Sequence, residues 1–192
     1  MYRSTSELLV RIHAQLEKTL TSNVMDVDVL LANYRKTPEH PYPTPPNDAH
    51  TMYRYLLDVE GIEPQNILIV GDSAGAGLSL ATLLRMYVPW GGCPKTWGDA
   101  SPIHCHLGGL PEAYIITGEF DYLLAQAHRL MARAKEDGVT NWHMDIHKHM
   151  VHVFMHIPPF VLPHASKGLE AMAVFAARKL VEETPNQPAC SW

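Results

Sequence analysis

The feature that most constrains the fold of this chain is a short apolar run that leads directly into a glycine-bounded turn. Residues 66–70, Asn-Ile-Leu-Ile-Val, are typical of a strand covered on both faces of a sheet. Residues 71–75, Gly-Asp-Ser-Ala-Gly, predict a tight turn, and a helical pattern follows it through residues 76–86. A strand, a tight turn and a helix in direct succession indicate a layered α/β fold.

The rest of the chain repeats this alternation. Apolar runs predict further strands within residues 26–33, 113–117 and 141–147. Helical spacing predicts helices over residues 8–20, capped by Ser4 or Ser6, and over residues 50–59, capped by Asn47 or Asp48, with two more over residues 123–137 and 165–183. Without a repeat or a linker, we expect a mostly parallel sheet flanked by helices in a single domain spanning residues 1–192.

Composition and charge narrow the classes of function. The chain has 192 residues, 46% hydrophobic and 18% charged, which fits one globular domain. Its net charge of -5 argues against a nucleic-acid partner, and no stretch reaches the roughly 18–20 apolar residues of a membrane span. The N-terminus has no hydrophobic signal core, so we expect a cytoplasmic protein in which Cys93, Cys105 and Cys190 are free thiols.

The pentapeptide at residues 71–75 fits the pattern Gly-x-Ser-x-Gly in the structural context that this pattern needs. A sharp turn from strand to helix would lift the hydroxyl of Ser73 above the sheet, and bulk at Gly71 or Gly75 would crowd that turn. The following helix would aim its N-terminus at the site, and the Ala74 N–H would be an oxyanion-hole donor. We therefore predict Ser73 as a nucleophile, with Asp72 bracing the turn.

A serine nucleophile needs a base, and the base needs an acid that orients it. Asp121 lies just after the predicted strand 113–117, where the acid of this fold is expected; Glu119 is the competitor, and capping the next helix is the structural alternative for Asp121. The base should follow the last strand.

Spacing alone leaves three histidines open for the base, namely His149, His152 and His156. The histidine-rich stretch could instead bind zinc, but no carboxylate or cysteine completes a convincing ligand set, and we predict no metal and no cofactor.

At this point several segments, in order, resemble the hormone-sensitive-lipase-like group of α/β hydrolases, which includes arylacetamide deacetylases and bacterial carboxylesterases. Residues 33–49, NYRKTPEHPYPTPPNDA, resemble the family's Y-R-x-x-P-E-x-P-[FY]-P segment. Residues 70–81, VGDSAGAGLSLA, are similar to its G-D-S-A-G-[GA]-x-L nucleophile elbow. Residues 100–123, ASPIHCHLGGLPEAYIITGEFDYL, are similar to its S-P-x…L-P-x-A…G-E-x-D-x-L acid segment, and residues 149–154, HMVHVF, stand where the family has an H-G-F-like end.

The resemblance covers nearly all of the chain from about Ser4 to Leu180. It implies an α/β-hydrolase fold with Ser73 as nucleophile, Asp121 as acid and His152 as general base. It therefore selects one of the three histidines that spacing leaves open.

The departures from the family pattern are also informative. The family's H-G-G-G segment, which supplies further oxyanion donors, is absent, and Val153 stands where the family has glycine. The stretch between Ser73 and Asp121 is too short for the family's central strand and cap helices. We expect a truncated or internally spliced chain, a partial domain without the N-terminal and central strands, in which residues 66–70 lose both neighbouring strands.

Two functions of different class follow from this pattern. The first is a serine carboxylesterase that hydrolyses small-molecule esters through an acyl-enzyme, with no cofactor. The alternative is a catalytically inactive fragment, or a non-catalytic small-molecule binder of the same fold. The sequence gives no indication of oligomeric state.

Overall fold

The computed structural model describes residues 8–11, 28–87 and 98–182. Its strands are β1 (Leu8–Arg11), β2 (Asp28–Leu31), β3 (Ile67–Val70), β4 (Ala113–Gly118) and β5 (Trp142–His147). Its longer helices are α2 (Thr44–Asp58), α3 (Ala74–Tyr87), α4 (Leu124–Glu136) and α5 (Ala165–Ala177). This order confirms the predicted α/β fold class, and no described helix is both long and apolar enough to cross a membrane.

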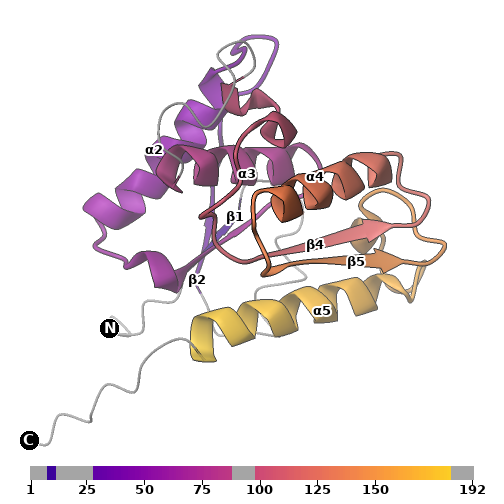
Figure 1. Ribbon diagram of the computed structural model, residues 1–192. Coiled ribbons are helices and arrows are strands. Elements are labelled where there is room, and N and C mark those ends of the chain that lie inside the picture. Colours follow the sequence, from indigo (N-terminus) through magenta and orange to yellow (C-terminus); the bar gives the residue numbers. More distant parts are fainter. Residues whose placement is uncertain (1–7, 12–27, 88–97, 183–192) are drawn as a thin grey trace, which may run out of the picture.

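Within the described residues the strands form two separate parallel sheets (Figure 1). In the first sheet β1 lies between β2 and β3, and Leu9 is opposite both Val29 and Leu68. In the second sheet β4 pairs with β5 along its whole length. No ladder of hydrogen bonds joins β3 to β4 in this part of the chain. This break lies where the sequence predicts that the central strand of the fold is missing.

The strand β1 corrects two of the sequence predictions. The expected helix over residues 8–20 is wrong at its start, because Leu8–Arg11 is a strand; residues 12–27 lie outside the described part. A run of only three apolar residues does not distinguish a strand from a helix by periodicity. Strand β3 also does not lose both neighbours, because β1 pairs with one of its edges and satisfies backbone groups there.

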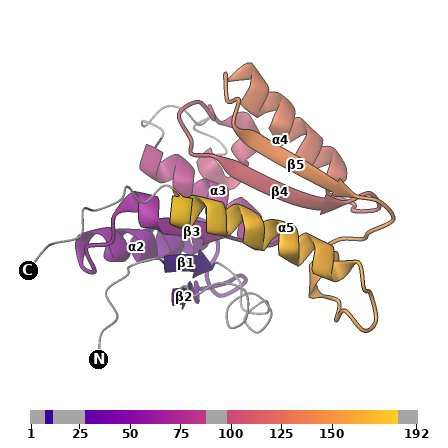
Figure 2. The same cartoon turned by 90° about the horizontal axis from the view of Figure 1, so that it is seen from below.

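Helices cover the second sheet on both faces. Figures 1 and 2 show α4 and α5 on opposite sides of the β4–β5 pair. On the α5 side, the ring of Tyr114 stacks on that of Phe175 at 5.3 Å between centroids. Helix α3 packs on α2 above the first sheet. The β4–β5 pair thus lies between two helices, as expected when both faces of parallel strands must be buried.

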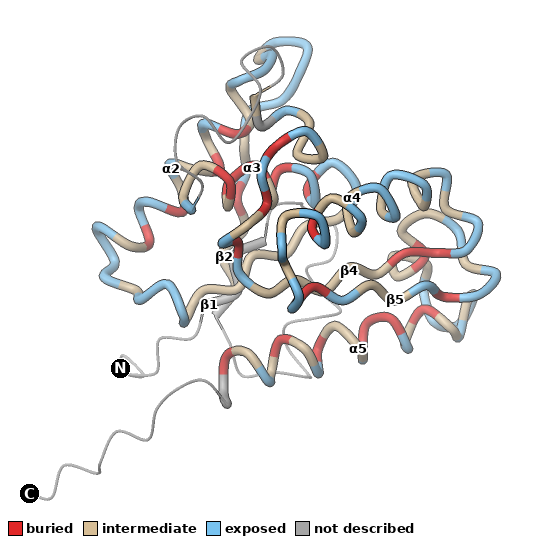
Figure 3. The backbone as a smooth tube through the Cα atoms, in the orientation of Figure 1, coloured by how far each residue is buried: buried red, intermediate tan, exposed pale blue. Residues whose placement is uncertain are grey.

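The largest buried apolar cluster joins two halves of the molecule, the one that contains the β1–β2–β3 sheet and the one that contains the β4–β5 pair. It connects α3, the segment before β4, α4 and β5, and Figure 3 marks the buried residues of the chain in red. Its buried members are Leu84, Cys105, Leu107, Leu110, Ala134 and Trp142. Side-chain packing therefore holds the two sheets together where backbone hydrogen bonds do not.

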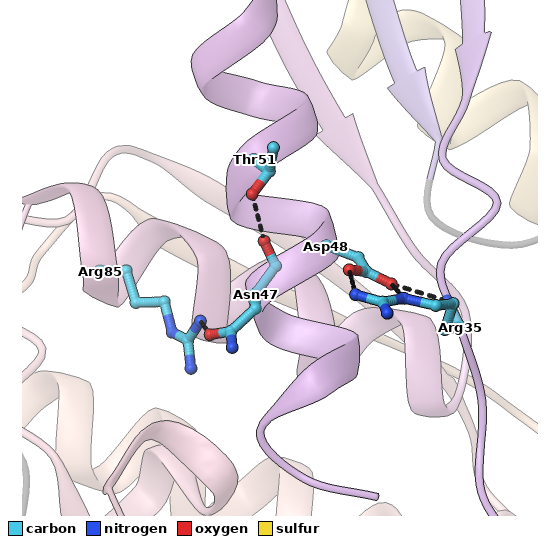
Figure 4. A network of polar contacts seen from close by, with 5 residues as sticks. All are labelled: Arg35, Asn47, Asp48, Thr51 and Arg85. Carbon is cyan, nitrogen blue, oxygen red and sulfur yellow. Dashed lines mark hydrogen bonds and ion pairs between the residues drawn. The ribbon is translucent and has the colours of Figure 1, made fainter. Parts of the chain in front are cut away.

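The N-terminus of α2 differs from its prediction. The helix begins at Thr44, with prolines in its first turn, and neither Asn47 nor Asp48 caps it. Asp48 instead binds Arg35, whose backbone N, Nε and Nη2 donate to the carboxylate at 2.9, 2.9 and 2.7 Å, as Figure 4 shows.

The prediction of free cysteines is wrong for Cys105. This residue is disulfide-bonded and fully buried within the large apolar cluster. Cys93 and Cys190 lie outside the described residues.

Candidate active site

Ser73 stands at the junction of β3 and α3 in a left-handed backbone conformation. Its φ is +50°, which is uncommon for a residue other than glycine. The turn is held by hydrogen bonds from the N–H of Gly75 to the carbonyl of Asp72 at 2.7 Å and from the N–H of Ala76 to that of Ser73 at 3.1 Å. The strained turn presents the serine hydroxyl above the C-terminal edge of β3.

The glycine that opens this turn is required by space. A Cβ added at Gly71 would lie 2.2 Å from the carbonyl oxygen of Gly75, which is backbone and cannot rotate away. Only glycine therefore allows the chain to fold back this closely between β3 and α3.

Three side chains from separate parts of the sequence meet at this turn. The Nε2 atom of His152 lies 2.8 Å from Oγ of Ser73. The Nδ1 atom of the same ring lies 3.0 Å from both carboxylate oxygens of Asp121. The side chains of His152 and Asp121 are 19% and 8% exposed, so this contact is largely shielded from water. With a proton on Nδ1 donated to Asp121, Nε2 is free to accept the proton of the serine hydroxyl.

The carboxylate of Asp121 is fixed by its own loop as well as by His152. It accepts hydrogen bonds from the N–H of Leu123 at 2.8 Å and from the hydroxyl of Thr117 at 3.3 Å. This contact is not the helix cap considered as the alternative for Asp121, because Leu123 is itself the N-cap residue of α4 and no side chain caps that helix. The carboxylate thus contacts its own loop and the imidazole.

Backbone contacts hold the loop of Asp121 against the loop of His152. The N–H of Glu119 donates to the carbonyl of His147 at 2.9 Å, and that of Phe120 to the carbonyl of Met150 at 2.8 Å. A Cβ at Gly118 would approach the Met150 carbonyl to 2.2 Å. The close approach of the two loops thus depends on a glycine at the end of β4.

The competing residues take other positions. Glu119 accepts a hydrogen bond from the backbone N–H of His149 at 2.8 Å and contacts its ring, and the side chain of His149 is 76% exposed. His156 pairs with Asp72, with Nε2 2.5 Å from Oδ2. Of the three histidines that spacing left open, His152 is the one that contacts Ser73.

The pair between Asp72 and His156 connects the turn of Ser73 to the loop of His152. Both side chains are mostly buried, 14% and 20% exposed. Burial, and then the negative charge of Asp72, raise the pKa of the nearby Tyr34 hydroxyl, which keeps that group neutral. The side chain of Asp72 thus contacts His156, a residue that the sequence indicated only as a candidate base; the bracing role of Asp72 stays a prediction.

The positive end of α3 also faces the turn. Within the described residues no carbonyl accepts a hydrogen bond from the Ala74 N–H, the first in the helix. An unpaired N–H at a helix N-terminus favours developing negative charge.

A second cluster of polar side chains, around His147, could not be predicted from the sequence. The imidazole of His147, buried at the end of β5, lies 2.9 Å from His164 and 3.1 Å from Asp145, and Asp145 accepts the hydroxyl of Tyr114 at 3.0 Å. These residues lie on β4, on β5 and before α5, and only the fold brings them together. In the described ranges no group of three or more such side chains is arranged to hold a metal ion.

Comparisons with known proteins agree with this architecture. A family profile described as the alpha/beta hydrolase fold matches residues 10–89 and 83–156. An acetyl-hydrolase of Streptomyces hygroscopicus is 28% identical over 193 aligned residues, covering 77% of this chain and 64% of the relative. The chain thus spans less than two thirds of that relative's length.

Solved structures of esterases resemble the fold. The crystal structure of an esterase/lipase from an uncultured bacterium superposes with a TM-score of 0.78 and 26% identity, over 92% of this chain and 78% of that one. An esterase from the bacterial hormone-sensitive lipase (HSL) family gives a TM-score of 0.69 and 28% identity, over 79% and 66% of the two chains.

Proposed function

The chain belongs to the α/β-hydrolase fold family, within its hormone-sensitive-lipase-like group, and from this premise we propose that it is a serine carboxylesterase acting on small esters. The observation that carries the proposal is the unbroken contact from Ser73 through His152 to Asp121. The esterase and acetyl-hydrolase names of its relatives support the same class of reaction.

In the first half of the proposed reaction, Oγ of Ser73 attacks the carbonyl carbon of the ester while Nε2 of His152 takes the hydroxyl proton. Asp121 keeps the imidazole in the required orientation and stabilises its positive charge. The Ala74 N–H would donate to the negative oxygen of the tetrahedral intermediate. The bond from the carbonyl carbon to the alcohol oxygen then breaks, and His152 gives its proton to the departing alcohol. The acyl group stays bound to Oγ of Ser73.

In the second half, a water molecule attacks the acyl-enzyme and His152 takes its proton. The carbon–oxygen bond to Ser73 breaks, the acid leaves, and the proton returns to the serine. Every step uses side chains and backbone of this chain, so the proposal requires no cofactor.

The proposal is tested by hydrolysis of 4-nitrophenyl butyrate by the 192-residue chain. We expect Ser73→Ala and His152→Ala each to lower kcat by at least about 10³-fold, because the members of such a triad act as a unit. His149→Ala is the matched control, since this nearby histidine is exposed and does not contact Ser73, and it should leave kcat within about two-fold. Equal rates for wild type and Ser73→Ala would contradict the proposal.

The alternative of an inactive, non-catalytic chain has one observation in its favour, the missing ladder between β3 and β4. Ser73 lies at the end of β3, whereas Asp121 and His152 follow β4 and β5. If the two halves move relative to each other in solution, the 2.8 Å contact is lost for part of the time. A folded chain without hydrolysis would support this alternative.

A further inference from the structure

A cavity of about 640 Å³ has Ala74, the residue after Ser73, in its wall. Its walls come from the loop after β2, the first turn of α2, the first two turns of α3 and Ala100 in the segment before β4, and they include Tyr34, Tyr42, Leu78 and Ala81. This volume is within the usual range of small-molecule sites. Because Ala74 follows Ser73 directly and its N–H is unpaired, the carbonyl group of a bound ester would sit at the mouth of this cavity.

The position of His152 decides which part of the ester faces the cavity. The departing alcohol must lie near Nε2 of His152, which gives it a proton. None of the cavity's lining residues belongs to the loops that carry His152 or Asp121. The alcohol therefore lies on the side of those loops, and the acyl chain extends into the cavity along α3.

One charged side chain, that of Lys36, lines the cavity, and no carboxylate does so within the described residues. Its Nζ lies 5.5 Å from the centre of the Tyr34 ring. No described acidic side chain forms an ion pair with Lys36. An apolar cavity with one such ammonium group is suited to an aliphatic chain that ends in a negative charge.

The loop that carries Lys36 is held in place. Its neighbour Arg35 makes three hydrogen bonds to Asp48 in the first turns of α2, and Asn47 on the same helix accepts one from Arg85 on α3 at 2.7 Å (Figure 4). Arg35 forms an ion pair with Asp48, an acidic residue of this helix. A held backbone thus carries Lys36 at the cavity, where its exposed side chain lies beside the Tyr34 ring.

We propose that the cavity holds the acyl group of the substrate and that Lys36 selects acyl chains that end in a carboxylate, that is, monoesters of aliphatic dicarboxylic acids. The acyl assignment rests on the proposed function. Hydrolysis of such a monoester breaks the acyl carbon–oxygen bond, takes up one water and releases the alcohol and the dicarboxylic acid.

The binding site is tested without catalysis. Calorimetric titration with adipate should give a Kd that rises about five-fold in Lys36→Met, while the Kd of heptanoate, which lacks the distal carboxylate, stays within two-fold. Lys167→Met, an exposed lysine on α5, removes the same charge elsewhere and should change neither. Adipate that fails to bind the wild-type chain, or an equal effect of Lys36→Met on both acids, would overturn the proposal.

Turnover separates this inference from the proposed function. With 4-nitrophenyl hydrogen adipate and 4-nitrophenyl heptanoate, Lys36→Met should raise KM about five-fold for the adipate ester alone and leave kcat unchanged. If the chain hydrolyses both esters and Lys36→Met has no selective effect, the acyl specificity is wrong and the esterase stands. If the chain hydrolyses neither ester but binds adipate through Lys36, the esterase is wrong and the anionic site stands.

Discussion

At the scale of single residues, Val153 has a backbone conformation that is unfavourable for valine. It directly follows His152 and has φ +46° and ψ +37°, in the left-handed region. A β-branched residue there costs on the order of 1–3 kcal/mol. The loop keeps the conformation that glycine would adopt, so the base is still placed at 2.8 Å from Ser73.

Replacement of Val153 by glycine should therefore stabilise the chain. We expect a gain of about 1 kcal/mol in the free energy of unfolding, because relief of the left-handed strain exceeds the extra entropy of glycine in the unfolded state. Urea unfolding of Val153→Gly measures this gain. Val151→Gly is the control, since Val151 has no positive φ and should lose about 0.5–1 kcal/mol. A lower free energy of unfolding for Val153→Gly than for wild type would contradict the inference that Val153 is strained.

Two glycines near the nucleophile should respond in opposite ways to alanine. Gly71→Ala places a methyl group 2.2 Å from the Gly75 carbonyl and should both destabilise the chain and lower kcat by at least about 10²-fold, since the turn must open. At Gly77, inside α3, a Cβ meets no atom within 4 Å, so Gly77→Ala should raise stability by about 0.5–1 kcal/mol. Thermal unfolding of both variants checks this; a neutral Gly71→Ala would show that the turn is not so constrained.

At the scale of elements, those with clear boundaries could be predicted from the sequence. Strands β3, β4 and β5 and helices α3 and α4 lie where apolar runs and turn residues place them. The error at β1 arose because Leu8–Arg11 becomes a strand only through its partners on β2 and β3, which are distant in sequence. The predicted cap of α2 was wrong for a similar reason, because the side chain of Asp48 binds Arg35 on another segment of the chain.

The ion pair of Arg35 with Asp48 connects α2 to the loop after β2, and its contribution to the free energy of unfolding should depend on pH. The hydrogen bond from the Arg35 side chain is the main cause that lowers the pKa of Asp48 from 3.8 to about 2. Because the folded-state pKa lies below the unfolded one, the stabilisation is complete above about pH 4 and is lost as the pH falls towards 2.

Urea unfolding at pH 6 and pH 2.5 tests whether this ion pair stabilises the chain in a pH-dependent way. Asp48→Asn should be less stable than wild type at pH 6, and the difference should shrink at pH 2.5. The control Asp58→Asn removes an exposed i,i+4 pair with Arg54 and should have a small effect. A difference for Asp48→Asn that is the same at both pH values would show that the charge of Asp48 is not responsible.

At the scale of the whole molecule, the site is assembled across two sheets that share no ladder in the described part of the chain. Ser73 comes from the β1–β2–β3 half, and Asp121 and His152 come from the β4–β5 half. The buried cluster around Leu84 and Trp142, and the pair of Asp72 with His156, hold these halves together. The sequence could predict the pentapeptide and the acid from local order, but spacing alone could not choose the histidine, because that choice depends on how the halves pack.

The central claim, that His152 activates Ser73 for nucleophilic attack, is tested most directly by covalent labelling with a fluorophosphonate. Attack of Oγ on phosphorus releases fluoride and leaves an adduct that intact-mass measurement and peptide mapping detect. We expect one adduct, on Ser73, that is absent in Ser73→Ala and forms at least about 10³-fold more slowly in His152→Ala. A folded chain that gains no adduct at Ser73, or that is labelled equally fast without His152, would contradict it.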